Sequence, residues 1–306
     1  MNGRHKLQAA ENFSRARWKA ALSRIQHFLH TGTDRLLSLH EVKDILKPKS
    51  ETYRGMRMVP IKLIVGSEGR YQDFTKYFLP RSNHLRERWE RIDEARLGDI
   101  ALPPIQLYEI GGVYFVRDGN HRVSVMGSQG AEYIDAEVTS LSSEIALSPG
   151  MSANTLREAV VRFEKKLFYE KTALGSLTGD QNLDFSRPGQ YDVLYNHILV
   201  HKYYLNEQFQ EELPFDQALI SWYHKVYTPI IQIIKGEKLS TQFPGRTAGD
   251  LYVWMVKHWD ILKRKYGVHY AIADAVRDFC VKYGKAKGFF FPKAARLLNR
   301  LFKPAL

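Results

Sequence analysis

Residues 118–122, with the sequence Asp-Gly-Asn-His-Arg, combine side chains that suit phosphate chemistry. The apolar run at 113–116 before them predicts a strand, and residues 123–128 after them predict a short helix that closes at Gly130. The first turn of a helix has unpaired backbone N–H groups and lies at the positive end of the helix dipole, so anions bind there readily. The segment therefore predicts an anion site, with phosphate as the first candidate.

Each of these five residues has a part in that prediction. Gly119 lets a ligand approach the backbone, and Asn120 offers a neutral amide. His121 supplies a hydrogen-bond donor or an acid near neutral pH, and Arg122 supplies a planar fork of donors that matches phosphate oxygens. The Asp118 carboxylate would repel a phosphate unless it holds Mg²⁺ or accepts a proton from an attacking hydroxyl, so we expect one of these two roles. The competing interpretation is an ordinary Asp-Gly turn that leaves His121 and Arg122 on the surface of the next helix.

A second set of candidates follows the strand predicted at residues 58–65. The loop that begins at Gly66 holds Glu68, Gly69 and Arg70. Arg70 could clamp phosphate and Glu68 could act as a base, because loops on a rigid scaffold often carry function. The alternative is that these are exposed loop residues with no part in a site.

Three histidines in the second half of the chain raise the question of a metal. His197 and His201 lie four residues apart on one predicted helix, and His258 is a remote third candidate. A zinc site needs three or four ligands, so packed or surface histidines are the favoured interpretation.

The first half of the chain alternates between helical and strand-like segments. Residues 9–30 and 34–46 have helical spacing and a hinge follows at residues 47–49, so residues 1–50 are predicted to be a helical arm. Residues 51–148 are predicted to form a small domain with a mixed sheet. Its expected elements are a strand at 58–65, a helix at 83–97, strands at 105–110 and 113–116 joined by a Gly111-Gly112 hairpin, a helix at 123–128 and a strand at 133–138.

Beyond a Ser/Pro/Gly linker at 140–150, every segment has helical character. Residues 149–284 are predicted to be an all-α domain and residues 285–306 a basic C-terminal tail, so the expected fold class is α+β. The predicted helices begin near Ser152, Ser186, Pro214, Thr247, His269 and Pro292, most with a capping residue or a proline in the first turn. Aromatic residues at helical spacing are predicted to be core, namely Tyr191, Tyr195, Tyr203, Tyr204, Trp222, Tyr223, Trp254 and Trp259.

The net charge of +12 lies mainly at the two ends of the chain. Residues 1–50 hold 10 Lys/Arg against 4 Asp/Glu, and residues 251–306 hold 12 against 3, whereas residues 101–200 hold 8 against 12. No acidic residue follows Asp278, so the last stretch is purely basic. It could contact nucleic acid non-specifically or an anionic membrane, and the alternative is a solvated helical face.

Cysteine content and hydropathy indicate the cellular compartment of the protein. The single Cys280 excludes a disulfide framework and a multi-cysteine metal site, which fits a reducing interior. Residues 1–8 lack the apolar region of a signal peptide, and no window approaches the roughly 20 apolar residues of a membrane span. We therefore expect a cytoplasmic protein with no integral membrane segment.

Two runs in the first half carry a family resemblance: PIKLIV at 60–65 and PPIQLYEIGGVYFVRDGNHR at 103–122. Together they resemble the ParB/sulfiredoxin-like superfamily over about residues 57–140. The resemblance implies a compact α/β fold with nucleotide phosphates against the turn from Gly119 to Arg122. That nucleotide is CTP in partition proteins, ATP in sulfiredoxin and ADP or ATP in the related free-serine kinases. The expected ligand is therefore a nucleotide such as ATP, ADP or CTP, with Mg²⁺.

The sequence departs from each of these members. Sulfiredoxin has its catalytic cysteine where this chain has Asn120, so sulfinic-acid reduction is not expected. Partition proteins have Glu-Arg-Arg at residues 120–122, whereas Asp118-Gly119 followed by a histidine is similar to the Asp-Gly-His of the serine kinases with one residue inserted. This similarity favours a Mg²⁺-dependent NTPase or small-molecule phosphotransferase with Asp118, His121 and Glu68 as catalytic residues. The alternatives are a DNA-associated regulator with nucleotide as ligand, and a nuclease.

The helical half carries a second resemblance at residues 243–254, FPGRTAGDLYVW. This run resembles a signature of uncharacterised bacterial proteins that pair a ParB-like module with a helical domain, and no activity comes with it. Thr247 and Asp250 fit a helix cap with an acidic third residue. Arg246 ahead of them could reach a ligand or a neighbouring carboxylate, but structural capping is the favoured interpretation.

Overall fold

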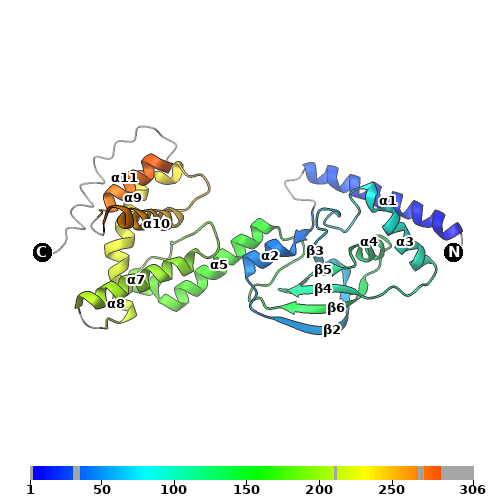
Figure 1. Ribbon diagram of the computed structural model, residues 1–306, viewed down its shortest axis with the longest axis horizontal. Coiled ribbons are helices and arrows are strands. Elements are labelled where there is room, and N and C mark those ends of the chain that lie inside the picture. The colour runs from blue at the N-terminus through cyan, green and yellow to red at the C-terminus, as the bar shows by residue number, and fades with distance from the viewer. Residues whose placement is uncertain (1–2, 30–34, 210–211, 268–269, 271, 284–306) are drawn as a thin grey trace. The chain divides into compact units, whose positions relative to one another are not determined.

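A computed structural model describes residues 3–29, 35–209, 212–267, 270 and 272–283 (Figure 1). The chain divides into two compact units, Met1–Arg157 and Glu158–Leu306, and each unit is described by itself. The predicted basic tail at 285–306 lies outside the described residues, as do the predicted helix starts at His269 and Pro292. Within the described residues, no helix combines the length and the apolar character needed to cross a membrane.

The first unit is built on one six-stranded mixed sheet, which with its helices makes the fold α+β as expected. The strand order is β1-β3-β5-β4-β6-β2. Strands β1, β3 and β5 run parallel to one another, β4 is antiparallel to β5 and parallel to β6, and β2 pairs antiparallel with β6 at the edge. The strands are β1 (Leu37–Ser38), β2 (Glu51–Pro60), β3 (Ile64–Ser67), β4 (Ile105–Ile110), β5 (Val113–Asp118) and β6 (Tyr133–Leu141).

The hairpin between β4 and β5 is confirmed at Gly111-Gly112. Both glycines have positive φ, 59° and 88°, the combination that a two-residue hairpin turn matching the twist of its strands requires. The turn therefore fixes the register of β5 against β4, and through it the position of the residues that follow β5.

The single strand predicted at residues 58–65 is wrong, because the chain there forms two strands. β2 ends at Pro60, which has no N–H to donate to a sheet and whose φ is −64°. A short 3₁₀ turn, η1 (Ile61–Leu63), then carries the chain from one edge of the sheet toward the other, where β3 lies between β1 and β5.

Helices cover the sheet of the first unit (Figure 1). They are α1 (Gly3–Leu29), α2 (Leu39–Leu46), the short turn η2 (Asn83–Leu85), α3 (Arg86–Leu97) and α4 (Asn120–Ser128). The opening helix α1 packs against α3, where the rings of Phe13 and Trp89 meet edge to face with centroids 5.6 Å apart. Beside them the Asn12 amide donates to the fully buried Asp93 carboxylate at 2.7 Å. Burial of these groups shows that α1 contributes to the core of this unit.

In the described residues of the second unit, all regular secondary structure is helical. Its helices after α5 (Ala153–Thr172), which spans the boundary between the units, are α6 (Leu174–Thr178), α7 (Gln190–Phe209), α8 (Phe215–Trp222), α9 (Thr228–Gly236), α10 (Ala248–Tyr266) and α11 (Ile272–Tyr283). A π-helical turn, η3 (Tyr223–Tyr227), joins α8 to α9, and a 3₁₀ turn, η4 (Leu239–Thr241), follows α9. The starts predicted near Ser152, Pro214 and Thr247 are confirmed within a residue or two.

Aromatic side chains contribute to the core of the second unit beside a larger number of aliphatic ones, and most of the predicted aromatics are buried in it or pack against it. Tyr191 and Trp222 are buried there, and Trp222 donates its indole N–H to the Tyr252 hydroxyl at 3.1 Å. The prediction is wrong for Tyr203 and Tyr204, which are 58% and 66% exposed on α7. Helical spacing alone does not distinguish the inner face of a long helix from its flank.

Candidate phosphate-binding site

The predicted site lies at the edge of the sheet where β3 and β5 end. Ser67 pairs with Val116 in the parallel ladder, and the next N–H, that of Glu68, donates to the Val116 carbonyl at 2.9 Å. The loop that begins at Glu68, two residues later than expected, and the turn after β5 therefore leave the sheet side by side. Carboxyl ends of parallel strands are where open α/β sheets bind their ligands.

Gly119 begins helix α4 in a conformation that favours glycine. Its φ is 106°, and a Cβ atom there would lie 2.4 Å from Cγ2 of Ile105. The helix starts at Asn120, three residues earlier than expected, so Asn120, His121 and Arg122 form its first turn. No side chain caps this end, and the backbone N–H groups of these three residues donate to no other residue that the structure describes.

The Arg122 guanidinium is hydrogen-bonded within the protein and is not free. Its guanidinium donates to the Asp118 carboxylate and to the carbonyl oxygens of Pro103 and Pro104, at 2.5 and 2.8 Å. Only 12% of the side chain is exposed. Arg122 therefore ties the turn to the chain before β4, and these bonds use three of its five N–H donors.

Two buried polar atoms at the start of α4 lack hydrogen bonds. Asn120 is 7% and His121 4% exposed, and neither Oδ1 of Asn120 nor Nε2 of His121 has a partner. The His121 ring meets Phe74 edge to face, with centroids 5.4 Å apart. Buried polar groups are nearly always hydrogen-bonded. Two unpaired atoms in consecutive residues at a helix N-terminus therefore indicate a place where a ligand could bind.

Burial above all, and then the charges of Arg88, Arg70 and His84, lower the pKa of His121 to about 4 against the opposing charge of Asp73. The imidazole is therefore neutral near pH 7. His121 can give or take a hydrogen bond there, but it is not the acid near neutral pH that its residue type predicts.

Two arginines and a second histidine lie near this ring. Arg70 pairs with Asp73 at 3.1 Å, and His84 lies 3.9 Å from the same carboxylate. Arg88, exposed on α3, has no ion pair with any described residue. The structure thus brings the predicted Arg70 to the site, whereas Arg88 and His84 were missed. The only signal for them was their spacing of four residues, which puts both on one side of a helical segment.

The remaining predicted residues show no contact that fixes a role. Glu68 is exposed, and its side chain makes no hydrogen bond or ion pair with a described residue. A side chain at Gly69 would meet open space, so this position does not demand glycine. For Mg²⁺, the described part of the chain contains no cluster of three His, Cys, Asp or Glu, and the Asp118 carboxylate is bonded to Arg122.

The three candidate histidines, His197, His201 and His258, belong to no metal-binding cluster among the described residues. His201 Nε2 lies 3.0 Å from the Ser221 hydroxyl, and His258 Nε2 lies 2.6 Å from the Asp278 carboxylate. His197 packs its ring against Tyr252 instead.

The segment at 243–254 has the structural role that was favoured for it. Thr247 and Asp250 form a complete capping box at the start of α10, and the Asp250 carboxylate also accepts from the Ser186 N–H. Arg246 donates to the Ser186 hydroxyl at 3.1 Å and lies over the Trp254 ring. These contacts join α10 to the segment that precedes α7.

No protein-family model matches the chain, and neither does any curated protein. Among solved structures, the C2221 crystal form of a Pnob8-like ParB-N domain is similar to it, with 12% sequence identity over 83% of this chain and all of that one. The TM-score is 0.20. A score this low does not establish a shared fold, so the α+β class rests on this chain's own elements.

Proposed function

We propose that the first unit binds the phosphate groups of a nucleotide at the start of helix α4. The observation that carries this proposal is the unpartnered buried Nε2 atom of His121 beside three backbone N–H groups with no acceptor among the described residues. Backbone N–H groups at a helix N-terminus are a common phosphate cradle. In its neutral form the His121 ring can carry its proton on Nε2 and add one more donor.

The surrounding charge favours an anion. Arg88 has no ion pair among the described residues, and Arg70 shares Asp73 with His84. A phosphate at this edge would gain from both guanidinium groups, which match its oxygens better than a point charge does. Exposed cations steer an anionic ligand to the site, and burial of the helix terminus strengthens the bonds formed there.

Asp118 and Arg122 would change partners in the bound state. A phosphate oxygen can replace the Asp118 carboxylate on the Arg122 guanidinium and release Asp118 toward Mg²⁺, which commonly takes one or two carboxylates together with phosphate oxygens. The proposed ligand is therefore a nucleoside di- or triphosphate, such as ATP, ADP or CTP, that carries its own Mg²⁺. Turnover as an NTPase or phosphotransferase would then use Asp118 as the residue that accepts a proton or holds the metal.

Calorimetric titration with ATP, ADP, CTP and GTP, each with and without Mg²⁺, tests the proposal. We expect at least one nucleotide to bind, and Arg88→Gln or Arg70→Gln to weaken its binding by roughly tenfold, as loss of a charge-assisted hydrogen bond does. Arg91→Gln is the matched control, because Arg91 lies on the same helix α3 and pairs with Glu87. Absence of binding by all four nucleotides would refute the proposal, and so would equal losses in all three variants.

A second measurement separates binding from turnover. Asp118→Asn should keep nucleotide affinity within a few fold and abolish phosphate release, if this unit hydrolyses or transfers phosphate. If the unmodified protein binds nucleotide and releases no phosphate, the site is a binding site only.

A further inference from the structure

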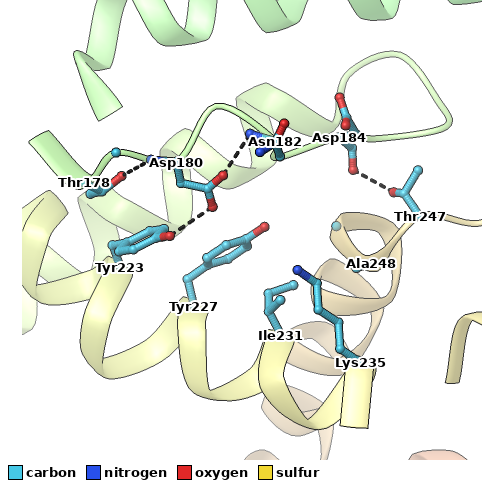
Figure 2. Close-up of a pocket in the computed structure, with 12 residues that line it drawn as sticks. Thr178, Asp180, Asn182, Asp184, Tyr223, Tyr227, Ile231, Lys235, Thr247 and Ala248 are labelled. Carbon is cyan, nitrogen blue, oxygen red and sulfur yellow. Dashed lines mark hydrogen bonds between the residues drawn. The ribbon is translucent and has the colours of Figure 1, made fainter. Parts of the chain in front are cut away.

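The second unit contains a cavity that the nucleotide proposal does not use. It has a volume of about 580 Å³ and lies between the loop at residues 178–184, the segment from η3 into α9, and the first turn of α10 (Figure 2). That is the size of a site for a small organic molecule. Its walls carry carboxylates, hydroxyls and one ammonium group, with little apolar surface beyond Ile231.

The two carboxylates of the loop are already fixed in place. Asp180 accepts the Tyr223 hydroxyl at 2.9 Å and the Asn182 backbone N–H at 2.8 Å. Asp184 is paired with Lys165 at 2.7 Å, which neutralises its charge. Each carboxylate has lone pairs beyond these bonds, so both can still accept hydrogen bonds from ligand hydroxyl groups.

The opposite wall presents donors that have no acceptor. Tyr227 is 4% exposed, yet its hydroxyl makes no hydrogen bond with any described residue. Lys235 likewise has no ion pair within the described chain. Figure 2 shows both side chains directed into the cavity from the same helical segment. Burial raises the pKa of the Tyr227 hydroxyl well above its usual range, so this group remains a donor at every physiological pH.

The start of α10 adds backbone donors beside them. Ala248 and Gly249 line the cavity, and their N–H groups donate to no described residue. The Asp250 carboxylate that caps this helix is turned back onto the N–H groups of Thr247 and Ser186. The two first-turn donors therefore stay available for a ligand.

Two tyrosines of the π-helical turn lie on one wall of the cavity. Tyr223 and Tyr227 are four residues apart, and in η3 their rings stack with centroids 5.7 Å apart and planes 27° from parallel. Single π turns inside α-helices are rare and occur frequently at functional sites. Here the turn places the Tyr223 hydroxyl on Asp180 and leaves the Tyr227 hydroxyl for the cavity.

From this arrangement we infer that the cavity binds a small hydroxylated molecule with one oxyanion group, a phosphate or a carboxylate. The oxyanion would lie between the Lys235 ammonium, the Tyr227 hydroxyl and the first turn of α10. The hydroxyl groups would donate to Asp180 and Asp184. The inference is independent of nucleotide binding by the first unit.

Glycerol 3-phosphate, glycerate and glycerol are the probes that test this inference, by calorimetry on the full chain. We expect glycerol 3-phosphate or glycerate to bind and glycerol not to bind. The first two probes distinguish a phosphate ligand from a carboxylate ligand. Lys235→Met should weaken binding by roughly tenfold or more, and Tyr227→Phe by a smaller factor, because each removes one donor to the oxyanion.

Matched controls keep the result interpretable. Lys257→Met and Tyr203→Phe remove the same groups from exposed positions that do not line the cavity. Binding by neither anionic probe overturns the inference. So does equal binding by glycerol, or equal losses in the cavity variants and their controls. Tyr227→Phe keeps the buried ring, so its unfolding temperature should stay close to that of the unmodified protein.

Discussion

His121 shows how one buried residue couples the proposed site to the stability of the first unit. Its pKa of about 4 lies below the ordinary 6.5, because burial and the neighbouring arginines oppose its charged form. Between these two pH values the unfolded chain binds a proton that the folded chain does not. The free energy of unfolding therefore rises with pH through this window, and stability is lost as the pH falls from 6.5 toward 4.

We predict that an NMR titration of His121 has its midpoint near pH 4. Between pH 7 and pH 4, His121→Asn should remove up to about 3 kcal/mol of the pH dependence of unfolding, which corresponds to the shift in its pKa. A midpoint near 6.5 would contradict the burial and the charges described for this ring. Bound nucleotide phosphate should move the midpoint upward, because it offsets the charge of Arg70 and Arg88.

Gly119 gives a second prediction for a single residue. Gly119→Ala should lower the free energy of unfolding by roughly 2–3 kcal/mol, because alanine is strained at φ 106° and its methyl group would collide with Ile105. Gly69→Ala is the control, since its position has neither a positive φ nor a close neighbour, and it should change stability by less than about 0.5 kcal/mol. Urea denaturation measures both. Equal effects would mean that the turn before α4 does not require glycine.

Among the elements, α1 carries a clear consequence for stability. Although the N-terminal residues were predicted to form a separate arm, α1 buries Phe13 completely against α3. Phe13→Ala should therefore destabilise the first unit by about 3–5 kcal/mol, the usual cost of truncating a buried phenylalanine. Trp18→Ala on the same helix removes a larger side chain that is 64% exposed, and should cost less than about 0.5 kcal/mol. Thermal unfolding distinguishes them, and similar costs would place α1 outside the core.

For the whole molecule, local sequence signals predicted local structure and failed where distant segments meet. The Gly111-Gly112 hairpin and the Thr247–Asp250 cap were predictable because their geometry depends on a few adjacent residues. The bonds from Arg122 to the carbonyls of Pro103 and Pro104 were not predictable. They join residues 18 and 19 positions apart, and they fix the position of an arginine whose residue type alone predicted a free guanidinium.

The same limit explains the residues that the sequence did not reveal. Arg88 lies near His121 because α3 packs against α4, and Tyr227 lines a cavity whose other walls come from the loop at residues 178–184 and the start of α10. The end of strand β2 at Pro60 could have been predicted, because proline rarely continues a sheet. The alternation of apolar residues around it instead favoured one continuous strand.

The two compact units lead to a last prediction, for the unfolding of the complete chain. Each encloses its own hydrophobic core, with Phe13 in the first and Leu194 in the second. We expect calorimetry to show that Phe13→Ala lowers the temperature of one transition and Leu194→Ala that of another, because each variant opens a cavity in one core only. The double variant should combine both shifts, as mutations at distant sites do. If each single variant instead moved one common transition of the whole chain, the units would unfold as a single cooperative structure.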